Sequence, residues 1–144
     1  MMHARTAGVR RILRVGNDMQ IERLDHLVLT VADVQATCEF YARVLGMQVV
    51  RFGEGRRALA FGQQKINLHA AGREFEPKAR LPTPGSADLC LITTTPLQQA
   101  QDHIVAAGVS IEQGPIQRTG ATGALLSIYF RDPDGNLIEV SNLL

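Results

Sequence analysis

Residues 129–141 read YFRDPDGNLIEVS and predict two strands joined by a tight turn. The turn is expected over residues 132–135, because proline presets φ, aspartate bonds its own backbone and glycine accepts a positive φ. In the second strand, Ile138 and Val140 share one face and Glu139 lies on the other. We expect the apolar face to pack against a helix, which turns Glu139 inward. An inward carboxylate needs a partner because desolvating its charge is costly, so we expect a cation opposite it.

The first half of the chain, residues 22–71, predicts a β-α-β-β-β unit. Leu24 to Val31 alternates as a half-buried strand, and Asp33 is expected to cap a helix that ends at Gly46. Further strand-like runs are Met47 to Arg51, Arg57 to Phe61 and Lys65 to Ala70.

The pattern starts again after residues 72–86, a proline- and glycine-containing stretch that we expect to form a loop. In residues 87–144 a strand at Asp88 to Thr93 precedes a helix, for which Thr95 is the expected N-cap and Pro96 the first helical residue. The expected later strands are Val109 to Gln113, Leu125 to Phe130 and Asn136 to Val140.

The two units therefore indicate an internal duplication. A shift that moves Gly46 onto Gly108 also moves His26 onto Asp88, and matching the ends of the units moves Asn67 onto Glu139. The expected fold class is α+β, with two tandem β-α-β-β-β units forming a curved, mostly antiparallel eight-stranded cleft or half-barrel. Such a cleft would contain a small set of inward polar side chains: His26, Asn67, His69, Asp88 and Glu139.

Composition narrows the function classes. The chain has 144 residues, 45% of them hydrophobic, and a formal net charge of +1, which describes a soluble globular protein and not a nucleic-acid-coating or disordered one. No apolar run is long enough to span a bilayer. Cys38 and Cys90 lie in apolar periodic segments and are expected to be reduced core thiols, which favours a cytoplasmic location. Residues 1–20 are arginine-rich and are expected to be a disordered tail, although such a leader is also typical of transit peptides.

Three segments resemble the vicinal oxygen chelate superfamily, which includes glyoxalase I, bleomycin-resistance proteins and extradiol dioxygenases. They are LDHLVLTVADVQATCEFYARVLGM, RALAFGQQKINLH and YFRDPDGNLIEVSN, and the likeness covers residues 22–144 as one glyoxalase-like domain. The resemblance implies a homodimer that binds a small-molecule substrate and a divalent metal ion: Zn, Ni, Co, Mn or Fe. It places metal ligands on the first, fourth, fifth and eighth strands.

Carried over by position, the first-strand ligand falls on His26 and the eighth-strand ligand on Glu139, and both match in type. The fifth-strand position holds Asp88 where histidine is usual, and the fourth-strand position holds Asn67, with His69 nearby. Asp88 is thus either a ligand or a charge partner of Arg131 or Lys78. His69 is either a ligand or a hydrogen-bonding group for the substrate.

The leading hypothesis is a metal-dependent glyoxalase-like enzyme of the lyase or isomerase type that chelates vicinal oxygens of its substrate, with Glu139 as the general base. We expect Asn67, Lys78 and Arg131 to contact the substrate. The first alternative is a metal-free binding protein of the bleomycin-resistance kind. The second is an Fe(II) extradiol-type dioxygenase, which would need His26, His69 and Glu139 to converge.

Overall fold

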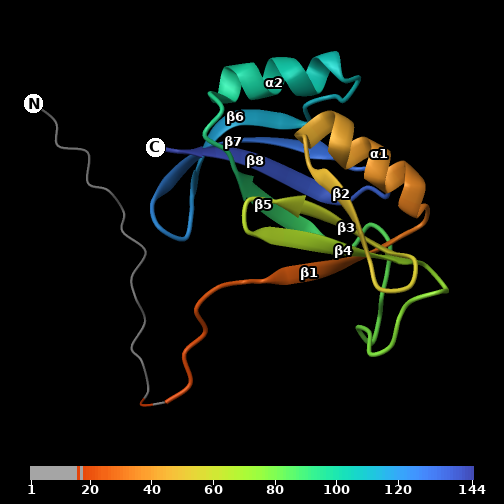
Figure 1. Ribbon diagram of the computed structural model, residues 1–144. Coiled ribbons are helices and arrows are strands. Elements are labelled where there is room, and N and C mark those ends of the chain that lie inside the picture. Colours follow the sequence, from red (N-terminus) through yellow and green to blue (C-terminus); the bar gives the residue numbers. More distant parts are fainter. Residues whose placement is uncertain (1–15, 17) are drawn as a thin grey trace, which may run out of the picture.

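The computed structural model describes residue 16 and residues 18–144, and it confirms two consecutive β-α-β-β-β units (Figure 1). The first unit contains β1 (His26–Val31), α1 (Val34–Leu45), β2 (Gln48–Phe52), β3 (Arg56–Phe61) and β4 (Gln64–Ala70). The second contains β5 (Asp88–Ile92), α2 (Leu97–Ala106), β6 (Gln113–Thr119), β7 (Ala124–Arg131) and β8 (Leu137–Leu143).

Each unit forms its own four-stranded mixed sheet. Sheet A has the order β1-β4-β3-β2 and sheet B has the order β5-β8-β7-β6. The β1/β4 and β5/β8 pairs are parallel, and the other pairs are antiparallel. The α+β class with two tandem units is therefore confirmed, and one chain supplies its eight strands as two sheets that do not close into a barrel.

The strand register matches the duplication residue by residue. Val28 of β1 lies opposite Asn67 of β4, and Cys90 of β5 lies opposite Glu139 of β8. Asn67 and Glu139 therefore occupy equivalent sites in the two sheets, as the alignment of the units predicted.

The helices cover one face of the sheets, and the core lies there. Apolar side chains of both sheets and both helices form one buried cluster, which includes Leu59, Ile104 and Ile138. Helix α1 of the first unit also touches sheet B, since the rings of Phe40 and Phe130 have centroids 6.4 Å apart. The two units thus join through their helix-facing sides, and the opposite face of each sheet takes no part in this core.

Helix ends follow the local signals closely in α1 and less closely in α2. Asp33 accepts a hydrogen bond from the backbone amide of Ala36 at 3.0 Å, and Gly46 ends α1 with a φ of 67°. The expectation that Thr95 caps α2 is wrong. The side chain of Asn142 accepts from the Leu97 amide at 2.8 Å, so a residue of β8 satisfies the first turn of this helix.

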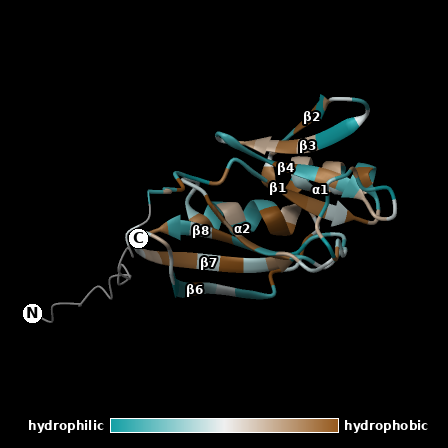
Figure 2. Cartoon of the chain, turned by 90° about the horizontal axis from the view of Figure 1, so that it is seen from below, coloured by the Kyte–Doolittle hydropathy of each residue, from teal (hydrophilic) through white to brown (hydrophobic). Residues whose placement is uncertain are grey.

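The expected strand at Val109 to Gln113 is also wrong, because β6 begins at Gln113. Val109 and Ile111 pack against the core, and the Val109 amide donates to the Ile104 carbonyl at the end of α2. Their apolar alternation therefore comes from an irregular segment after α2 that packs on the core. Strand β6 itself is largely hydrophilic, whereas β7 beside it is largely hydrophobic (Figure 2). A polar edge strand that contains Pro115 is protected against pairing with another chain.

The DPDGN turn joins the two units through Asp132, a carboxylate that is only 5% exposed. Its Oδ1 accepts from the backbone amides of Asp134 and Asn136, both at 2.9 Å. Its Oδ2 accepts from the Asn136 side-chain amide at 2.8 Å and from the Tyr41 hydroxyl of α1 at 2.7 Å. One side chain thus fixes the turn, the start of β8 and the helix of the other unit.

Part of the expected tail, residues 1–15 and 17, lies outside the described residues. Residues 16 and 18–20 are exposed and belong to no helix or strand. Neither of the two described helices is long and apolar enough to cross a membrane.

The four hydrogen bonds of Asp132 generate a stability prediction. Asp132→Asn replaces an acceptor by an amide donor that faces the Asn136 amide, so it should lower the free energy of unfolding by about 3 kcal/mol. Tyr41→Phe removes one donor and should cost about 1 to 2 kcal/mol. Urea denaturation measures both changes. The double variant should lose less than the sum of the two, and an Asp132→Asn protein as stable as the wild type would contradict this account.

Tyr41 also generates a pH prediction. Burial first, and then the Asp132 carboxylate, raise the pKa of Tyr41 above its ordinary value. The folded protein therefore keeps the phenol proton where the unfolded chain loses it, so stability should fall as pH rises above about 10.

Only two tyrosines are present, so Tyr129→Phe leaves Tyr41 as the single reporter. Its near-ultraviolet absorbance should change only as the protein unfolds at alkaline pH, and circular dichroism monitors that unfolding. A tyrosinate signal that forms in the folded protein would count against a buried hydrogen bond to Asp132.

Candidate functional site

The predicted polar residues lie on the faces of the sheets that point away from the helices. We call the face of sheet A that carries Lys65, Asn67 and His69 open face A, and the face of sheet B that carries Cys90 and Glu139 open face B. The opposite side of β3 faces α1, since Arg57 donates to Gln35 of that helix. These faces hold two separate polar clusters in one chain.

Open face B is centred on Glu139, whose carboxylate is held by serine hydroxyls. Ser127 donates to Oε2 at 2.6 Å, and Ser141 donates to the same oxygen at 3.3 Å. The two serine oxygens are 2.6 Å apart, and Cys90 Sγ lies 3.3 Å from Ser141 Oγ. The expected cation opposite Glu139 is therefore wrong within the described chain, where none of the ion pairs involves this residue.

Cys90 corrects a second expectation. Cys38 is buried in the core as predicted, but Cys90 is exposed on open face B. The sequence of β5 did not show which positions face the helices and which lie on the open face, because the strand carries apolar side chains on both faces.

His26 and Asp88 lie at the starts of the two leading strands, and both are exposed. The Nδ1 atom of His26 lies 2.8 Å from a carboxylate oxygen of Asp25. The Nε2 atom of His26 takes no part in this contact. This hydrogen bond is the main reason that the pKa of Asp25 is lowered. In the part of the chain that the structure describes, Asp88 forms no ion pair.

The two cations considered as partners of Asp88 bind other carboxylates. Arg131 pairs with Glu112 at 3.0 Å. Lys78 pairs with Glu74 and Glu76, both at 3.5 Å. Arg131 and Lys78 are therefore not the charge partners of Asp88. Substrate contact stays a prediction for both.

Open face A holds two buried polar side chains in its fourth strand. Asn67 is 5% exposed, and its Oδ1 atom is buried without a hydrogen-bond partner among the described residues. His69 is 4% exposed, and its Nε2 atom lies 3.5 Å from an amino group of Arg56. Burial first, and then the charge of Arg56, lower the pKa of His69, so the neutral imidazole is favoured.

Sequence reasoning missed the cationic and aromatic residues around this strand. The guanidinium carbon of Arg56 lies 4.9 Å from the ring centroid of Phe52 and 4.7 Å from that of Phe75. The ammonium of Lys65 lies 3.9 Å from the Phe52 centroid. Phe52 and Arg56 are opposite each other at the end of the β2-β3 hairpin. An aromatic residue and an arginine flanking the glycine-containing turn 53–55 were the available sequence signal.

The donors predicted for a metal do not form a metal site within one chain. Among the residues that the structure describes, no group of three or more His, Cys, Asp or Glu side chains could hold an ion. His26 and His69 belong to sheet A, whereas Asp88 and Glu139 belong to sheet B. A metal bound by this set would need the open faces of the two sheets to meet.

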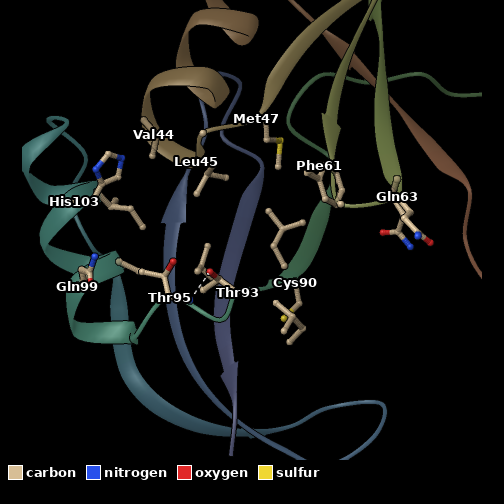
Figure 3. Close-up of a pocket in the computed structure, with 18 of the residues that line it drawn as sticks. Val44, Leu45, Met47, Phe61, Gln63, Cys90, Thr93, Thr95, Gln99 and His103 are labelled. Carbon is tan, nitrogen blue, oxygen red and sulfur yellow. Dashed lines mark hydrogen bonds between the residues drawn. The ribbon is translucent and has the colours of Figure 1, made fainter.

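A cavity of about 840 Å³ lies between the units and reaches the edge of open face B at Cys90. It is lined by the end of α1, the β3-β4 turn, β5 and α2, and Figure 3 shows Val44, Met47, Phe61 and Cys90 around it. Its lining contains neither His26 nor Glu139, and it is mostly apolar. The volume suits a small molecule. Of the three buried side-chain polar atoms without partners among the described residues, however, Arg56 Nε and Asn67 Oδ1 are on open face A, and Gln101 Oε1 is on α2.

Comparison with known proteins agrees with this architecture. The family model of the Glyoxalase/Bleomycin resistance protein/Dioxygenase superfamily matches residues 23–140. Virulence protein STM3117 of Salmonella typhimurium is 61% identical over 123 residues, which cover 85% of each chain. Glyoxalase domain-containing protein RDO1 of Mycosarcoma maydis is 54% identical over 129 residues, which cover 90% of this chain and 73% of that protein.

Two solved structures are similar throughout. The crystal structure of STM3117 has a TM-score of 0.86 at 60% identity and covers 88% of this chain and 100% of that one. The integron cassette protein VCH_CASS1 of V. cholerae has a TM-score of 0.85 at 63% identity and covers 86% and 97%. The family model and these relatives, together with the duplicated fold, show that the chain belongs to the glyoxalase/bleomycin resistance protein/dioxygenase superfamily.

Proposed function

We propose that this protein is a metal-dependent, glyoxalase-like enzyme that acts on a small, oxygen-rich molecule at its open faces. The observation that carries the proposal concerns Asn67 and Glu139, which occupy equivalent sites in the two sheets. The Oδ1 atom of Asn67 is buried without a partner in the described part of the chain, and both serine contacts of Glu139 reach the same oxygen, Oε2. Buried acceptors without partners are costly, and they suit a bound ligand.

The proposed site needs two copies of the chain. One chain joins its units through the helix-facing sides, so it leaves apolar side chains exposed on both leading strands. Val28 of β1 is 43% exposed and Ile92 of β5 is 52% exposed. A homodimer that places open face A of one copy against open face B of the other would cover these residues and bring the two polar clusters together.

In this dimer, His26 and Glu139 would bind a divalent ion (Zn, Ni, Co, Mn or Fe), with Asp88 or His69 completing the set. The hydrogen bond of His26 to Asp25 supports this role, because histidine ligands commonly donate their second nitrogen to a carboxylate. The contact of His69 with Arg56 favours Asp88 as the further ligand, since a cation beside a metal ligand weakens metal binding. Bound metal would act as a Lewis acid on the substrate oxygens.

Glu139 is the proposed general base. Hydrogen bonds from Ser127 and Ser141 orient its carboxylate through Oε2, so Oε1, once released from the ion, is the oxygen that would accept a substrate proton. Asn67, Lys78 and Arg131 are proposed to contact the substrate.

The second candidate function is metal-free binding of a small molecule. The cavity of about 840 Å³ favours it, because its lining is mostly apolar and contains no carboxylate. This alternative needs neither His26 nor Glu139, so metal binding separates the two functions.

Metal analysis tests the leading proposal. Protein purified without chelator should contain about one transition-metal ion per chain. Adding metal to stripped protein should raise the melting temperature by roughly 5 to 10 °C, because the ion binds only the folded state. Glu139→Ala and His26→Ala should each abolish this rise. Asp102→Ala is the matched control, because it removes an exposed carboxylate of α2 whose hydrogen-bond partner is Gln98 of the same helix.

Absence of both bound metal and metal-induced stabilisation, across all five ions, would overturn the enzyme proposal. The metal-free binding protein would then be the better account, and ligand screening should be directed at the cavity.

A further inference from the structure

We propose that open face A is a recognition site for a small hydroxycarboxylate, with Arg56 and Lys65 binding the carboxylate and Asn67 accepting a hydrogen bond from the hydroxyl. This inference names the substrate class for the proposed function. It rests on that function in one respect, because the proposed function places the substrate at the open faces.

Two cationic side chains contact one aromatic ring. The guanidinium of Arg56 and the ammonium of Lys65 lie 4.9 and 3.9 Å from the ring centroid of Phe52. Neither cation belongs to an ion pair among the described residues. A bound anion would lower the repulsion between these two like charges.

Among the described residues, the guanidinium of Arg56 has an unpaired donor on an edge that can bind a carboxylate. The rings of Phe52 and Phe75 lie over it at 4.9 and 4.7 Å, so its hydrogen-bond donors remain in its plane. One of these donors, the Nε–H group, is buried without a hydrogen-bond partner among the described residues. A planar guanidinium with an unpaired Nε–H group matches the bidentate geometry of carboxylates.

Three carboxylates lie close in sequence to this cluster, Glu54, Glu74 and Glu76, and none forms an ion pair with Arg56 or Lys65 among the described residues. Glu74 has a side chain that is 8% exposed, and it pairs with Lys78 and accepts from the backbone amide of Gly72 at 3.0 Å. The segment that holds Glu74 also places Phe75 against His69, with ring centroids 5.6 Å apart. The loop thus supplies a wall to the site and keeps its own carboxylate engaged elsewhere.

Asn67 and His69 define the second half of the ligand. Asn67 lies between Lys65 and His69 on the same face of β4, and its buried Oδ1 needs a donor. A ligand hydroxyl supplies one, whereas a second carboxylate does not. Arginine has no acceptor, so its contact with Nε2 places the proton of neutral His69 on Nδ1. These groups favour a ligand that carries both a carboxylate and a hydroxyl.

The test uses L-lactate as the probe and L-lactamide as its neutral counterpart, on metal-stripped, full-length protein. The Nε–H resonance of Arg56 in proton-nitrogen NMR spectra should shift with lactate, with saturation below about 50 mM, and stay in place with lactamide. Arg56→Gln and Lys65→Gln should each weaken lactate binding by about tenfold. In these variants, lactate binding is measured from the backbone amide resonances of β4. Equal shifts with lactate and lactamide, or no shift at all, would overturn the proposal.

Arg57→Gln is the matched control. Arg57 is the next residue along β3 but points to Gln35 of α1, so its loss should leave the lactate affinity unchanged. Unchanged spectra outside the site and an unchanged melting temperature verify the fold of each variant. Wild-type affinity in Arg56→Gln, or equal losses in Arg56→Gln and Arg57→Gln, would contradict a specific site.

The hydroxyl is tested with propionate, which lacks it. Propionate should bind the wild type more weakly than lactate, and the two acids should bind Asn67→Ala equally. Equal binding of both acids to the wild type would remove Asn67 from the site. Metal-stripped wild-type protein separates this inference from the metal proposal, because it should prefer lactate to lactamide whether or not metal analysis finds a bound ion.

Discussion

The fold depends on the buried carboxylate of Asp132. It accepts four hydrogen bonds, from two backbone amides, the Asn136 side chain and the Tyr41 hydroxyl of the other unit. Because a carboxylate is an acceptor only, no neutral side chain of the same size can receive all four. The turn before β8, the start of that strand and the orientation of α1 are therefore set together, and the position of Glu139 on β8 follows from them.

Duplication explains why the functional groups are divided between two faces. Equivalent strands place Asn67 and Glu139 at corresponding positions, but the surrounding residues differ in chemistry. Open face B surrounds its carboxylate with hydroxyl groups, whereas open face A surrounds its amide with Arg56, Lys65 and aromatic rings. A site made from both faces would combine a proton acceptor with an anion-binding surface, which suits an acidic, oxygen-rich substrate.

Sequence reasoning succeeded where the signals are local or repeated. The DPDG turn, the Asp33 and Gly46 ends of α1 and the duplicated order of elements depend on residues close in the chain, or on a pattern that occurs twice. It failed where the partner comes from a distant strand. The cap of α2 is supplied by Asn142, and the partners of Glu139 depend on the register of β7 and β8. The cluster at Arg56 needs β2, β3, β4 and the loop at Phe75 together, so the stretch 52–56 signals only one part of it.

The central claim is that the functional site joins open face A of one copy to open face B of another. Mixing two deficient proteins, His26→Ala and Glu139→Ala, after partial unfolding and refolding tests it most directly. Each mixed dimer would contain one site with both ligands intact, so metal-induced stabilisation should return in the mixture although each parent lacks it. Stabilisation that remains absent in verified mixed dimers would contradict the account, because it would mean that both ligands must come from the same chain.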